Sequence, residues 1–473
     1  MRKTIIICTT FILIASLTVA CSVLLNGSNN NICYGYEITG DCTKEAIDKA
    51  IERITQINGG VLKLKKNGVY RIRPVSEHVF ILPSHIKIEG NGARIIIEDA
   101  VNTKDFTWDA VFYSEGKSDI TIENVILEAN GNRNPVLQKS VPNGATRHNG
   151  LLSALRTNNI TIKKCTVKDV KGFGCLYFGY CNNVIVEDCH FYDIGVKHST
   201  SFIGDASVLM GVGKNWLIQR NEMHNDYLSD CGTGLDLACS HSTIKNNIIE
   251  SFWAGANLTN NGFDNSCNVV LEDNEFINNA TAIYLWATIK PFVGSCFDNI
   301  IRNNHIKWTT RSTWGVRGID LGCFVYGDVY NITINNNEFV AQAIDAPNES
   351  YEIAIRIGPT EKTYSGLNNS GGRVHDVEIY DNTISGCTGP AVQIERVSHN
   401  ITVRNNTIKD VSLGNASYTT NSAIVLGGYS NEVGPRDITI EENLFSGNKM
   451  RDINKVYVGT SNERRKKSNI IIN

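Results

Sequence analysis

The stretch VVLEDNEF, from Val269 to Phe276, contains the pattern that decides the fold of this chain. Two alternating apolar residues, Val269 and Leu271, are followed by two polar residues, an Asn and a further apolar position. Alternation with a period of two is typical of a β-strand that buries one face, because successive side chains of a strand point to opposite sides. We interpret the stretch as a strand that ends in a bend at Asn274.

The same pattern recurs along the chain, and consecutive copies begin 24 to 45 residues apart. Copies begin at Ile120, Ile160, Val184, Trp216, Ser242, Val269, Ile300, Ile332, Val377, Ile401 and Ile438. Repeats with this period predict a solenoid. A turn of roughly 24 residues holds three short strands and their bends, and parallel strands about 4.8 Å apart bury one face of every turn in a continuous core. The predicted fold is all-β, a right-handed single-stranded parallel β-helix.

An Asn falls at the sixth position of most copies, which supports the solenoid. These residues are Asn221, Asn247, Asn274, Asn304, Asn337, Asn382, Asn406 and Asn443. A buried polar side chain is stable only when it is hydrogen-bonded, and stacked amides can bond to the turns above and below them. We therefore predict an Asn ladder at one bend of the coil. Cys165 and Cys189 take this place in two earlier copies.

The composition excludes some classes of partner. The net charge is −3, so no general positive field favours a nucleic acid partner. The one basic run, Arg464 to Lys467, lies near the C-terminal end and is interpreted as a solvated tail or loop. Ten N-x-S/T sequons make the chain a candidate glycoprotein in a host that glycosylates, although several of them are simply part of the repeated motif.

The N-terminal segment predicts export. Arg2 and Lys3 precede an uncharged run from Thr4 to Leu25, and this order favours an outside location for the rest of the chain. A cleaved signal peptide, a lipid anchor at Cys21 and an uncleaved membrane anchor are the three alternatives. The predicted location is extracellular or at the cell surface. The predicted division is a signal peptide or anchor over 1–25, a linker over 26–40 and a β-helix domain over 41–473.

Outside the cell, cysteines become disulfide candidates. Cys165 and Cys189 occupy the same place in adjacent turns, and Cys33 and Cys42 flank a short loop. A further group lies just before repeat strands and is expected at one bend, namely Cys181, Cys239, Cys267 and Cys296. Buried thiols are the alternative for each of these residues. The spacing of Cys and His does not match a zinc site, so no structural metal is predicted.

The segment from Asp41 to Gly60 predicts a helix that covers the open end of the solenoid. Thr43 can cap it and the Gly59-Gly60 pair can end it. One apolar face is formed by Ala46, Ile47, Ala50, Ile51 and Ile54. An uncovered end would expose strand edges and core, so a cap is expected there.

The stretch GDCTKEAIDKAIERITQINGGVLKLKKNGVYRI, which begins at Gly40, resembles the start of pectate-lyase-like proteins of the pectin lyase fold superfamily. The resemblance extends from about Asp41 to the end of the chain, and it implies a parallel β-helix. The superfamily includes polysaccharide lyases, hydrolases, epimerases and viral tailspikes, so the resemblance does not imply one activity. The catalytic motifs of polygalacturonases and of calcium-dependent pectate lyases are absent from this sequence.

A second strand in each turn predicts a row of outward-facing residues. In segments such as GLDLAC and GIDLG, apolar residues flank one polar or aromatic residue. The candidate substrate-binding residues of this row are Asp236, Tyr284, Asp320 and Arg356, with Gln393 in line with them. Stacked along a rod, they would form a groove for a linear sugar chain. The alternative is that they are merely the polar surface of a sheet.

Loops between the strands supply the candidate catalytic residues, because irregular loops on a rigid scaffold often hold function. These candidates are Asp226, Asp230, Asp236, His148, His224 and Lys197, with Arg147 and Arg220 as further substrate-binding candidates. Glycoside hydrolysis needs two carboxylates. β-Elimination from a uronate needs a base and a positive charge near the carboxylate. Arg or Ca²⁺ could supply that charge, so Ca²⁺ is the one candidate cofactor.

Two functional classes remain from the sequence. The first is an exported carbohydrate-active enzyme, a lyase, epimerase or hydrolase, with a polysaccharide as its partner. The second is a non-catalytic surface or virion protein that binds glycans or forms a rigid stalk. Convergence of Asp226, Asp230 and Asp236 with a His or Arg in one groove would favour the enzyme.

Overall fold

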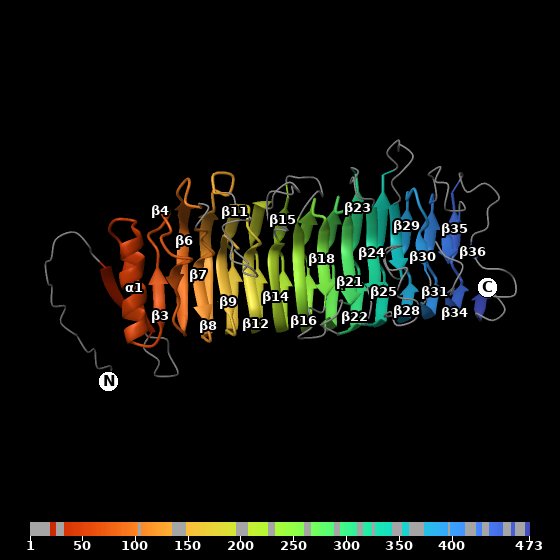
Figure 1. The fold of residues 1–473 in the computed structure, drawn as a ribbon, viewed down its shortest axis with the longest axis horizontal. Helices are drawn as coiled ribbons and strands as arrows, with labels where there is room; N and C mark the ends of the chain where they lie inside the picture. The colour runs from red at the N-terminus through yellow and green to blue at the C-terminus, as the bar shows by residue number, and fades with distance from the viewer. Residues whose placement is uncertain are drawn as a thin grey trace, which may run out of the picture.

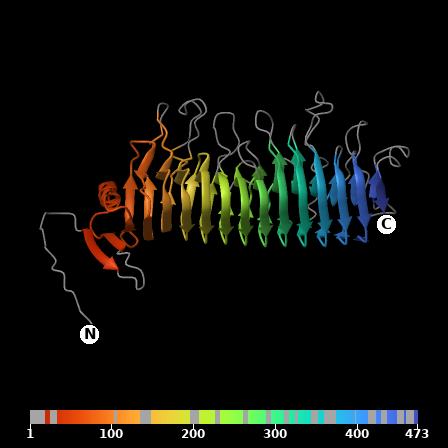
Figure 2. The ribbon, with the colours of Figure 1, turned by 90° about the horizontal axis from the view of Figure 1, so that it is seen from below.

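The computed structural model describes residues 19–24, 33–102, 106–134, 148–194, 207–225, 232–259, 266–287, 294–309, 316–323, 327–342, 352–358, 373–395, 398–411, 422–427, 435–447, 456–458 and 469–473. In these parts, each turn of the chain pairs in parallel with the turns before and after it. The turns stack in sequence order from the N-terminal helix to the last strand, so the molecule is a rod (Figures 1 and 2). The predicted all-β parallel β-helix is confirmed.

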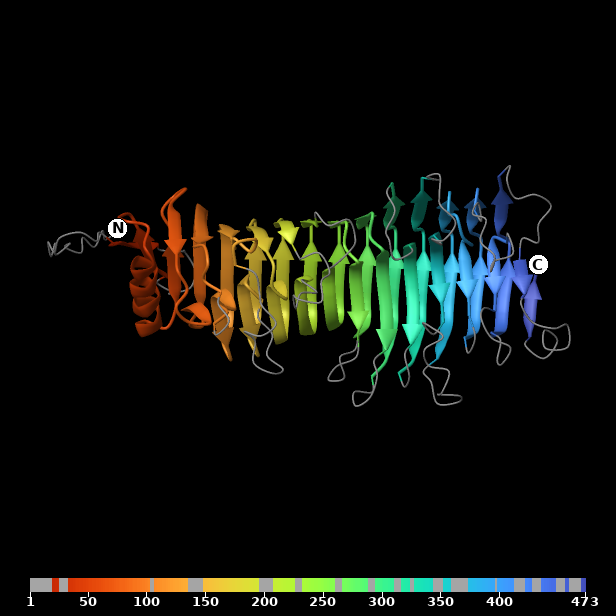
Figure 3. The same cartoon turned by 45° about the horizontal axis from the view of Figure 1, so that its top comes forward.

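The strands form one continuous hydrogen-bonded array that bends within each turn and so presents three faces, seen from a third direction in Figure 3. The strands of the repeated motif lie on face I. This face is formed by β2 (Cys33–Ile38), β3 (Gly60–Lys63), β10 (Asn158–Lys163), β19 (Ser266–Glu272), β22 (Cys296–Arg302), β25 (Val329–Asn335), β28 (Val374–Tyr380), β31 (His399–Arg404), β34 (Arg436–Glu441) and β37 (Ile470–Ile472).

Face II follows face I within each turn. Its strands are β4 (Val69–Ile72), β11 (Thr166–Val170), β13 (His190–Ile194), β15 (Glu222–His224), β17 (Ile248–Glu250), β20 (Glu275–Ile277), β23 (His305–Trp308), β26 (Glu338–Ala341), β29 (Thr383–Ser385), β32 (Thr407–Lys409) and β35 (Leu444–Ser446). Two longer strands run from face I into face II, namely β6 (Ile86–Ile97) and β8 (Ser118–Glu128).

Face III completes the turn. Its strands are β5 (His78–Ile81), β7 (Ala110–Glu115), β9 (Gly150–Leu155), β18 (Ala254–Thr259), β21 (Thr281–Ala287), β24 (Val316–Cys323), β27 (Glu352–Ile357), β30 (Val392–Ile394), β33 (Ile424–Leu426) and β36 (Val456–Val458). Three longer strands run from face III into face I, namely β12 (Gly174–Glu187), β14 (Ser207–Gln219) and β16 (Thr233–Lys245).

The bends at the two ends of the face I strands explain the richness in Asn and Asp. In β19, Asn268 and the following bend residue Asp273 both have left-handed backbone conformations, with φ near +54° and +56°. Asn400 and Asn405 repeat this arrangement around β31. Asn and Asp adopt this conformation more readily than other residues with a Cβ. Several sequons therefore exist because the bends require Asn, as the sequence predicted.

The Asn ladder is confirmed. Nδ2 of Asn274 donates to Oδ1 of Asn304 at 3.0 Å and to the Ile244 carbonyl at 2.9 Å. Oδ1 of Asn274 accepts from the backbone N–H and the Nδ2 of Asn247, at 3.0 and 2.9 Å. The same contacts link Asn221 through to Asn443 in successive turns. Each buried amide thus bonds to the turns on both sides.

The disulfide candidates are free thiols where the structure describes their side chains, which is the alternative that the sequence left open. Cys165 and Cys189 are free, and so is Cys42, while the side chain of Cys33 is outside the described part. Cys165 and Cys189 lie in adjacent turns, but their sulfurs form hydrogen bonds to backbone groups at the bend where later turns have the Asn ladder. Sγ of Cys165 donates to the Lys163 carbonyl at 3.4 Å, and Sγ of Cys189 accepts from the backbone N–H of Cys165 at 3.4 Å.

The expected column of cysteines at one bend is confirmed in part. Gly213 pairs with Cys181 on one side and Cys239 on the other, so the two thiols occupy the same place in the coil. Burial raises the pKa of each of these thiols to about 12, so they stay protonated at neutral pH. Their role in the described structure is packing.

The capping helix is confirmed as α1 (Lys44–Gln56), at the N-terminal end of the rod (Figure 1). Oγ1 of Thr43 accepts from the backbone N–H of Ala46 at 3.2 Å. The buried residues of the helix are the predicted apolar face. No helix in the described parts of the chain has the length and apolar character needed to cross a bilayer.

The predicted linker over 26–40 needs correction. Cys33–Ile38 is strand β2, which pairs in parallel with β3 and antiparallel with β1 (Val19–Leu24). Ile38 is buried, and Tyr36 packs against the core. The alternation of Tyr34, Tyr36 and Ile38 with smaller or polar residues suits a strand, and the open edge of β3 provides its partner.

We predict that Asn274→Leu lowers the free energy of unfolding by about 3 kcal/mol, because it leaves buried groups in two neighbouring turns without partners. Denaturant unfolding followed by far-UV circular dichroism measures the change. Glu275→Gln in the next position serves as the control, since Glu275 is outside the ladder. Equal stabilities of the two variants would contradict the assigned role of the ladder.

Candidate functional site

A column of mainly polar side chains runs along face III, one in each turn. Strand register places in this column Asp236, Asn257, Tyr284, Asp320, Arg356 and Gln393. We call these six residues the outward ladder. The predicted alignment of Asp236, Tyr284, Asp320 and Arg356 is therefore confirmed, and Asn257 occupies the turn that the sequence prediction left out.

The predicted exposure of this row is wrong for most of its members. Asp320 is 1% exposed, Arg356 5% and Tyr284 7%. Among the six residues of the outward ladder, only Asp236 is partly exposed. Hydrogen bonds and ion pairs join side chains of adjacent turns along the rod, so these residues form two clusters in place of an open groove.

The first cluster centres on the guanidinium of Arg356. Nη1 of Arg356 lies 3.1 Å from Oδ2 of Asp320, and Nε lies 3.1 Å from Oε1 of Glu395. Arg317 also contacts Asp320, with Nη1 2.7 Å from Oδ2, and Gln393 donates to Glu395 at 3.0 Å. Burial lowers the pKa of Arg356, but the charges of Asp320 and Glu395 outweigh burial and hold the pKa above its usual value. The cluster is a buried, charge-compensated network.

The second cluster centres on the carboxylate of Asp236. Nδ2 of Asn257 donates to Oδ1 of Asp236 at 3.0 Å, and Nε1 of Trp286 donates to Oδ1 of Asn257 at 2.6 Å. The rings of Trp286 and Tyr284 are stacked 5.8 Å apart, and Trp253 meets Tyr284 edge-on at 6.4 Å. Trp253 is 39% exposed and Trp286 is partly exposed. An oriented carboxylate is thus linked through Asn257 to the partly exposed indole of Trp286.

This arrangement has the parts needed to hold a sugar ring. Aromatic side chains supply a flat apolar surface together with a polar edge, and buried polar groups fix orientation at ligand sites. The Trp286–Asn257–Asp236 chain of hydrogen bonds holds the carboxylate in one position. The second cluster is the better candidate site, because the carboxylates of the first cluster are buried and paired with Arg356.

Two predicted site residues lie on other parts of the coil. His224 is in β15 on face II, with Nδ1 2.9 Å from Oε2 of Glu250. Arg220 follows β14 at the bend between faces I and II, with Nε 2.6 Å from Oδ1 of Asp188. Neither residue lies beside Asp236 on face III, so the predicted gathering of these side chains does not occur. Both predictions relied on closeness in sequence, which a coil with three faces does not preserve.

The other loop candidates have mixed outcomes. His148 lies directly before β9 on face III, in an earlier turn than Asp236. The remaining candidates are outside the described residues, namely Arg147, Lys197, Asp226 and Asp230. Their convergence with Asp236 stays a prediction.

Sequence reasoning missed Trp253, Trp286, Asn257 and Glu395. Asn257 lies in AGANLT, which shows no alternation of large apolar residues. It could have been found only from the number of residues that separate it from the next copy of the repeated motif. Trp253 directly precedes this strand. Glu395 is the last residue of AVQIE, and finding it would have required the expectation that this position faces Arg356.

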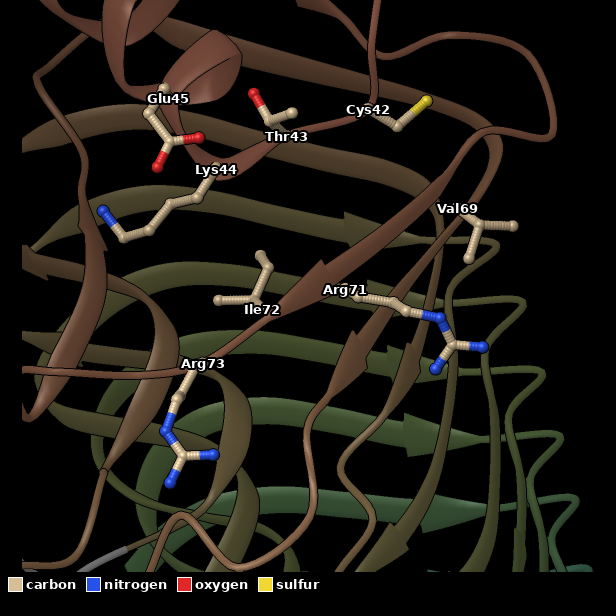
Figure 4. A pocket seen from close by; sticks show the side chains of 8 residues that line it. All are labelled: Cys42, Thr43, Lys44, Glu45, Val69, Arg71, Ile72 and Arg73. Atoms are coloured by element: carbon tan, nitrogen blue, oxygen red, sulfur yellow. The ribbon is translucent and has the colours of Figure 1, made fainter.

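No group of three His, Cys, Asp or Glu side chains in the described parts of the chain is arranged to hold a metal ion. Ca²⁺ stays a prediction. A cavity of about 460 Å³ lies at the N-terminal cap (Figure 4), where Lys44 of α1 and Arg73 are among the lining residues. Lys44 pairs with Asp48, and Arg73 pairs with Glu98. This cavity is at the end of the rod and is separate from the outward ladder.

Comparison with known proteins supports the fold. Residues 196–356 match a family model described as a right-handed β-helix region. An inulin fructotransferase (DFA-I-forming) of Arthrobacter globiformis is 23% identical over 174 residues, which is 33% of this chain. The match spans 44% of that enzyme, so less than half of the curated relative is represented here.

Solved structures of similar shape have several functions. An exopolygalacturonase of Thermotoga maritima has a TM-score of 0.52 and 14% identity, covering 86% of this chain and 88% of its own. The tailspike of E. coli bacteriophage HK620 in complex with a pentasaccharide has a TM-score of 0.56 and 14% identity, covering 88% and 76%. PfbA, a surface adhesin of Streptococcus pneumoniae, has a TM-score of 0.52 and 16% identity, covering 89% of each chain. These identities show the fold alone.

We predict that Arg356→Met lowers the free energy of unfolding by about 3–5 kcal/mol, because it leaves the buried carboxylate of Glu395 without a cation and that of Asp320 with Arg317 alone. Arg317→Gln is the control, since Arg317 is 39% exposed, and its effect is expected below about 1 kcal/mol. Urea unfolding of the three proteins measures both values. An Arg356→Met variant as stable as the control would rule out the network as a structural element.

Proposed function

Given that this chain is a right-handed parallel β-helix protein, we propose that it is an exported carbohydrate-active protein that binds a polysaccharide along face III and cleaves or modifies it at Asp236. One observation carries this proposal. The partly exposed carboxylate of Asp236 accepts a hydrogen bond from Asn257, and the same amide accepts one from the partly exposed indole of Trp286. Export rests on the N-terminal segment, where Arg2 and Lys3 precede the uncharged run.

The proposed chemistry begins with the Asp236 carboxylate. An ionised carboxylate can act as a general base or as a nucleophile toward a sugar. Glycoside hydrolysis needs a second carboxyl group as the acid, and Asp226 and Asp230 are the predicted partners. Elimination from a uronate would instead need a base such as Lys197, and a positive charge from Arg147 or Ca²⁺.

The named functions of similar proteins support a glycan as the partner. The fructotransferase and the exopolygalacturonase are named for reactions on carbohydrate polymers, and the tailspike structure contains a bound pentasaccharide.

Glycan binding without turnover is the second candidate function, and the first cluster favours it. Asp320, Glu352 and Glu395 on the same part of face III are all buried, and Asp320 and Glu395 are paired with Arg356. Asp236 is therefore the one accessible carboxylate among these described residues, and cleavage by two carboxylates requires a partner from beyond them. A binding protein would need no such partner.

We predict that Asp236→Asn reduces turnover at least about 100-fold and leaves the fold intact, because the amide retains the shape but does not accept a proton. Alginate, pectate, hyaluronan, inulin and neutral glucans are incubated with the protein, with Ca²⁺ or with EDTA. Reducing ends and the ultraviolet absorbance of unsaturated uronates are followed together. A rise in both signals indicates elimination, and a rise in reducing ends alone indicates hydrolysis.

Asp273→Asn is the matched control, since it makes the same chemical change at a bend where Asn is the usual residue of other turns. Full activity of Asp236→Asn would remove Asp236 from the reaction. Binding of a glycan by the wild-type protein, with no product from any polymer, would establish the second candidate function in place of the first.

A further inference from the structure

A second group of polar and aromatic side chains lies on face III, in the turns that precede Asp236. We call it the N-terminal cluster, and its members are His78, Asp109, Tyr113, His148, Asn149 and Tyr177. They come from β5, β7 and β12 and from the residues directly before β7 and β9. The sequence prediction included His148 alone from this cluster.

Asp109 and His78 form a dyad at the centre of the cluster. Oδ2 of Asp109 lies 3.3 Å from Nε2 of His78, and Oδ1 accepts from the backbone N–H of His148 at 2.9 Å. Asp109 is 4% exposed, and burial raises its pKa. The hydrogen bond from His78 and the charge of His148 outweigh burial, so the net pKa of Asp109 is lowered and the carboxylate is ionised.

The dyad determines which nitrogen of His78 is basic. An ionised carboxylate accepts a proton donor, so Nε2 of His78 carries the hydrogen and Nδ1 holds the lone pair. His78 is partly exposed, with a quarter of its side chain accessible. A buried carboxylate that orients a partly exposed imidazole is the usual way to prepare a histidine for contact with a ligand.

Aromatic rings form a platform beside the dyad. The ring of His78 stacks on Tyr113 at 3.7 Å and 14°, and the ring of His148 stacks on Tyr177 at 4.3 Å and 14°. Tyr113 pairs with Ser153, and Ser153 pairs with Tyr177, so the two tyrosines are two turns apart in one column. That separation is about 10 Å along the rod. Tyr113 and Tyr177 are both partly exposed.

Asn149 provides an independent sign of a ligand. It is 2% exposed, and neither Nδ2 nor Oδ1 has a hydrogen-bond partner among the described residues. Ala110 pairs with Gly150, so Asn149 occupies the place next to Asp109 in the adjacent turn. Buried side-chain amides without partners are rare in native proteins, and such a group requires an explanation.

We propose that the N-terminal cluster is a second glycan site. Sugar rings of one glycan chain pack against Tyr113 and Tyr177, and their hydroxyl groups bond to Nδ1 of His78 and to the amide of Asn149. Asp109 is a positioning residue that fixes the tautomer of His78. The glycan as ligand class rests on the proposed function, but the site is separate from Asp236 in position and in residues.

The tautomer of His78 is tested by ¹⁵N NMR of histidine-labelled full-length protein. We expect one tautomer, protonated at Nε2, in the wild-type protein, and a mixture of tautomers in Asp109→Asn. Asp298→Asn, at a partly exposed bend of face I, is the matched control and is expected to leave the His78 signals unchanged. A mixed state in the wild-type protein would overturn the dyad, and unchanged signals in Asp109→Asn would overturn the role of Asp109.

Glycan binding is tested by titration of hexasaccharides of pectate, alginate, hyaluronan and inulin into Asp236→Asn, so that turnover does not interfere. The imidazole of His78 reports on the N-terminal cluster, and the indoles of Trp253 and Trp286 report on the Asp236 site. We expect a glycan to shift the His78 signals, with an affinity that Tyr113→Ala lowers about tenfold, since a stacked ring contributes about 1 kcal/mol or more.

The two sets of signals separate the two proposals. Shifts of the indoles without shifts of His78 would overturn the second site and leave the proposed function in place. Shifts of His78 without shifts of the indoles would support the second site and count against binding at Asp236. If no hexasaccharide shifts His78, or if Tyr113→Ala binds as well as its parent, the cluster is a structural one whose Asn149 holds ordered water.

Discussion

The hydrogen bonds of the buried Asn ladder are the interaction on which the rest of this structure depends. Each amide bonds to the turn before it and the turn after it, so a slip in register would break contacts in both directions. The amides therefore fix how residues of distant sequence positions align. That alignment extends around the coil to face III, where it places Asp236 beside Asn257 and Asp320 beside Arg356.

The same alignment explains why face III is not a uniform groove. Side chains in adjacent turns are one strand spacing apart, so they can form hydrogen bonds and ion pairs with one another. Around Arg356, side chains of opposite charge form a buried network. Where an amide, a carboxylate and indole rings meet instead, as at Asp236 and Trp286, the surface stays partly accessible. The buried network around Arg356 and the partly accessible site around Asp236 thus lie at different positions along face III.

The sequence was sufficient for the solenoid, the Asn ladder, α1 and the alignment of the outward ladder, because each depends on a local period or a single bend. Burial of Arg356 was not predictable, since it depends on Glu395 in the following turn. Adjacent Cys165 and Cys189 were correctly placed, but the direction of their sulfurs depends on the ladder. Asp109 was missed because it precedes a strand outside the repeated motif.

Amide hydrogen exchange with a bound glycan tests the central claim, that face III is the ligand-binding surface of the coil. A hexasaccharide bound by the protein should slow exchange in β16, β18 and β21, and leave β15, β17 and β20 of face II unchanged. Protection confined to face I or face II at a saturating glycan concentration would contradict the account, because the ligand would then bind to a face other than face III.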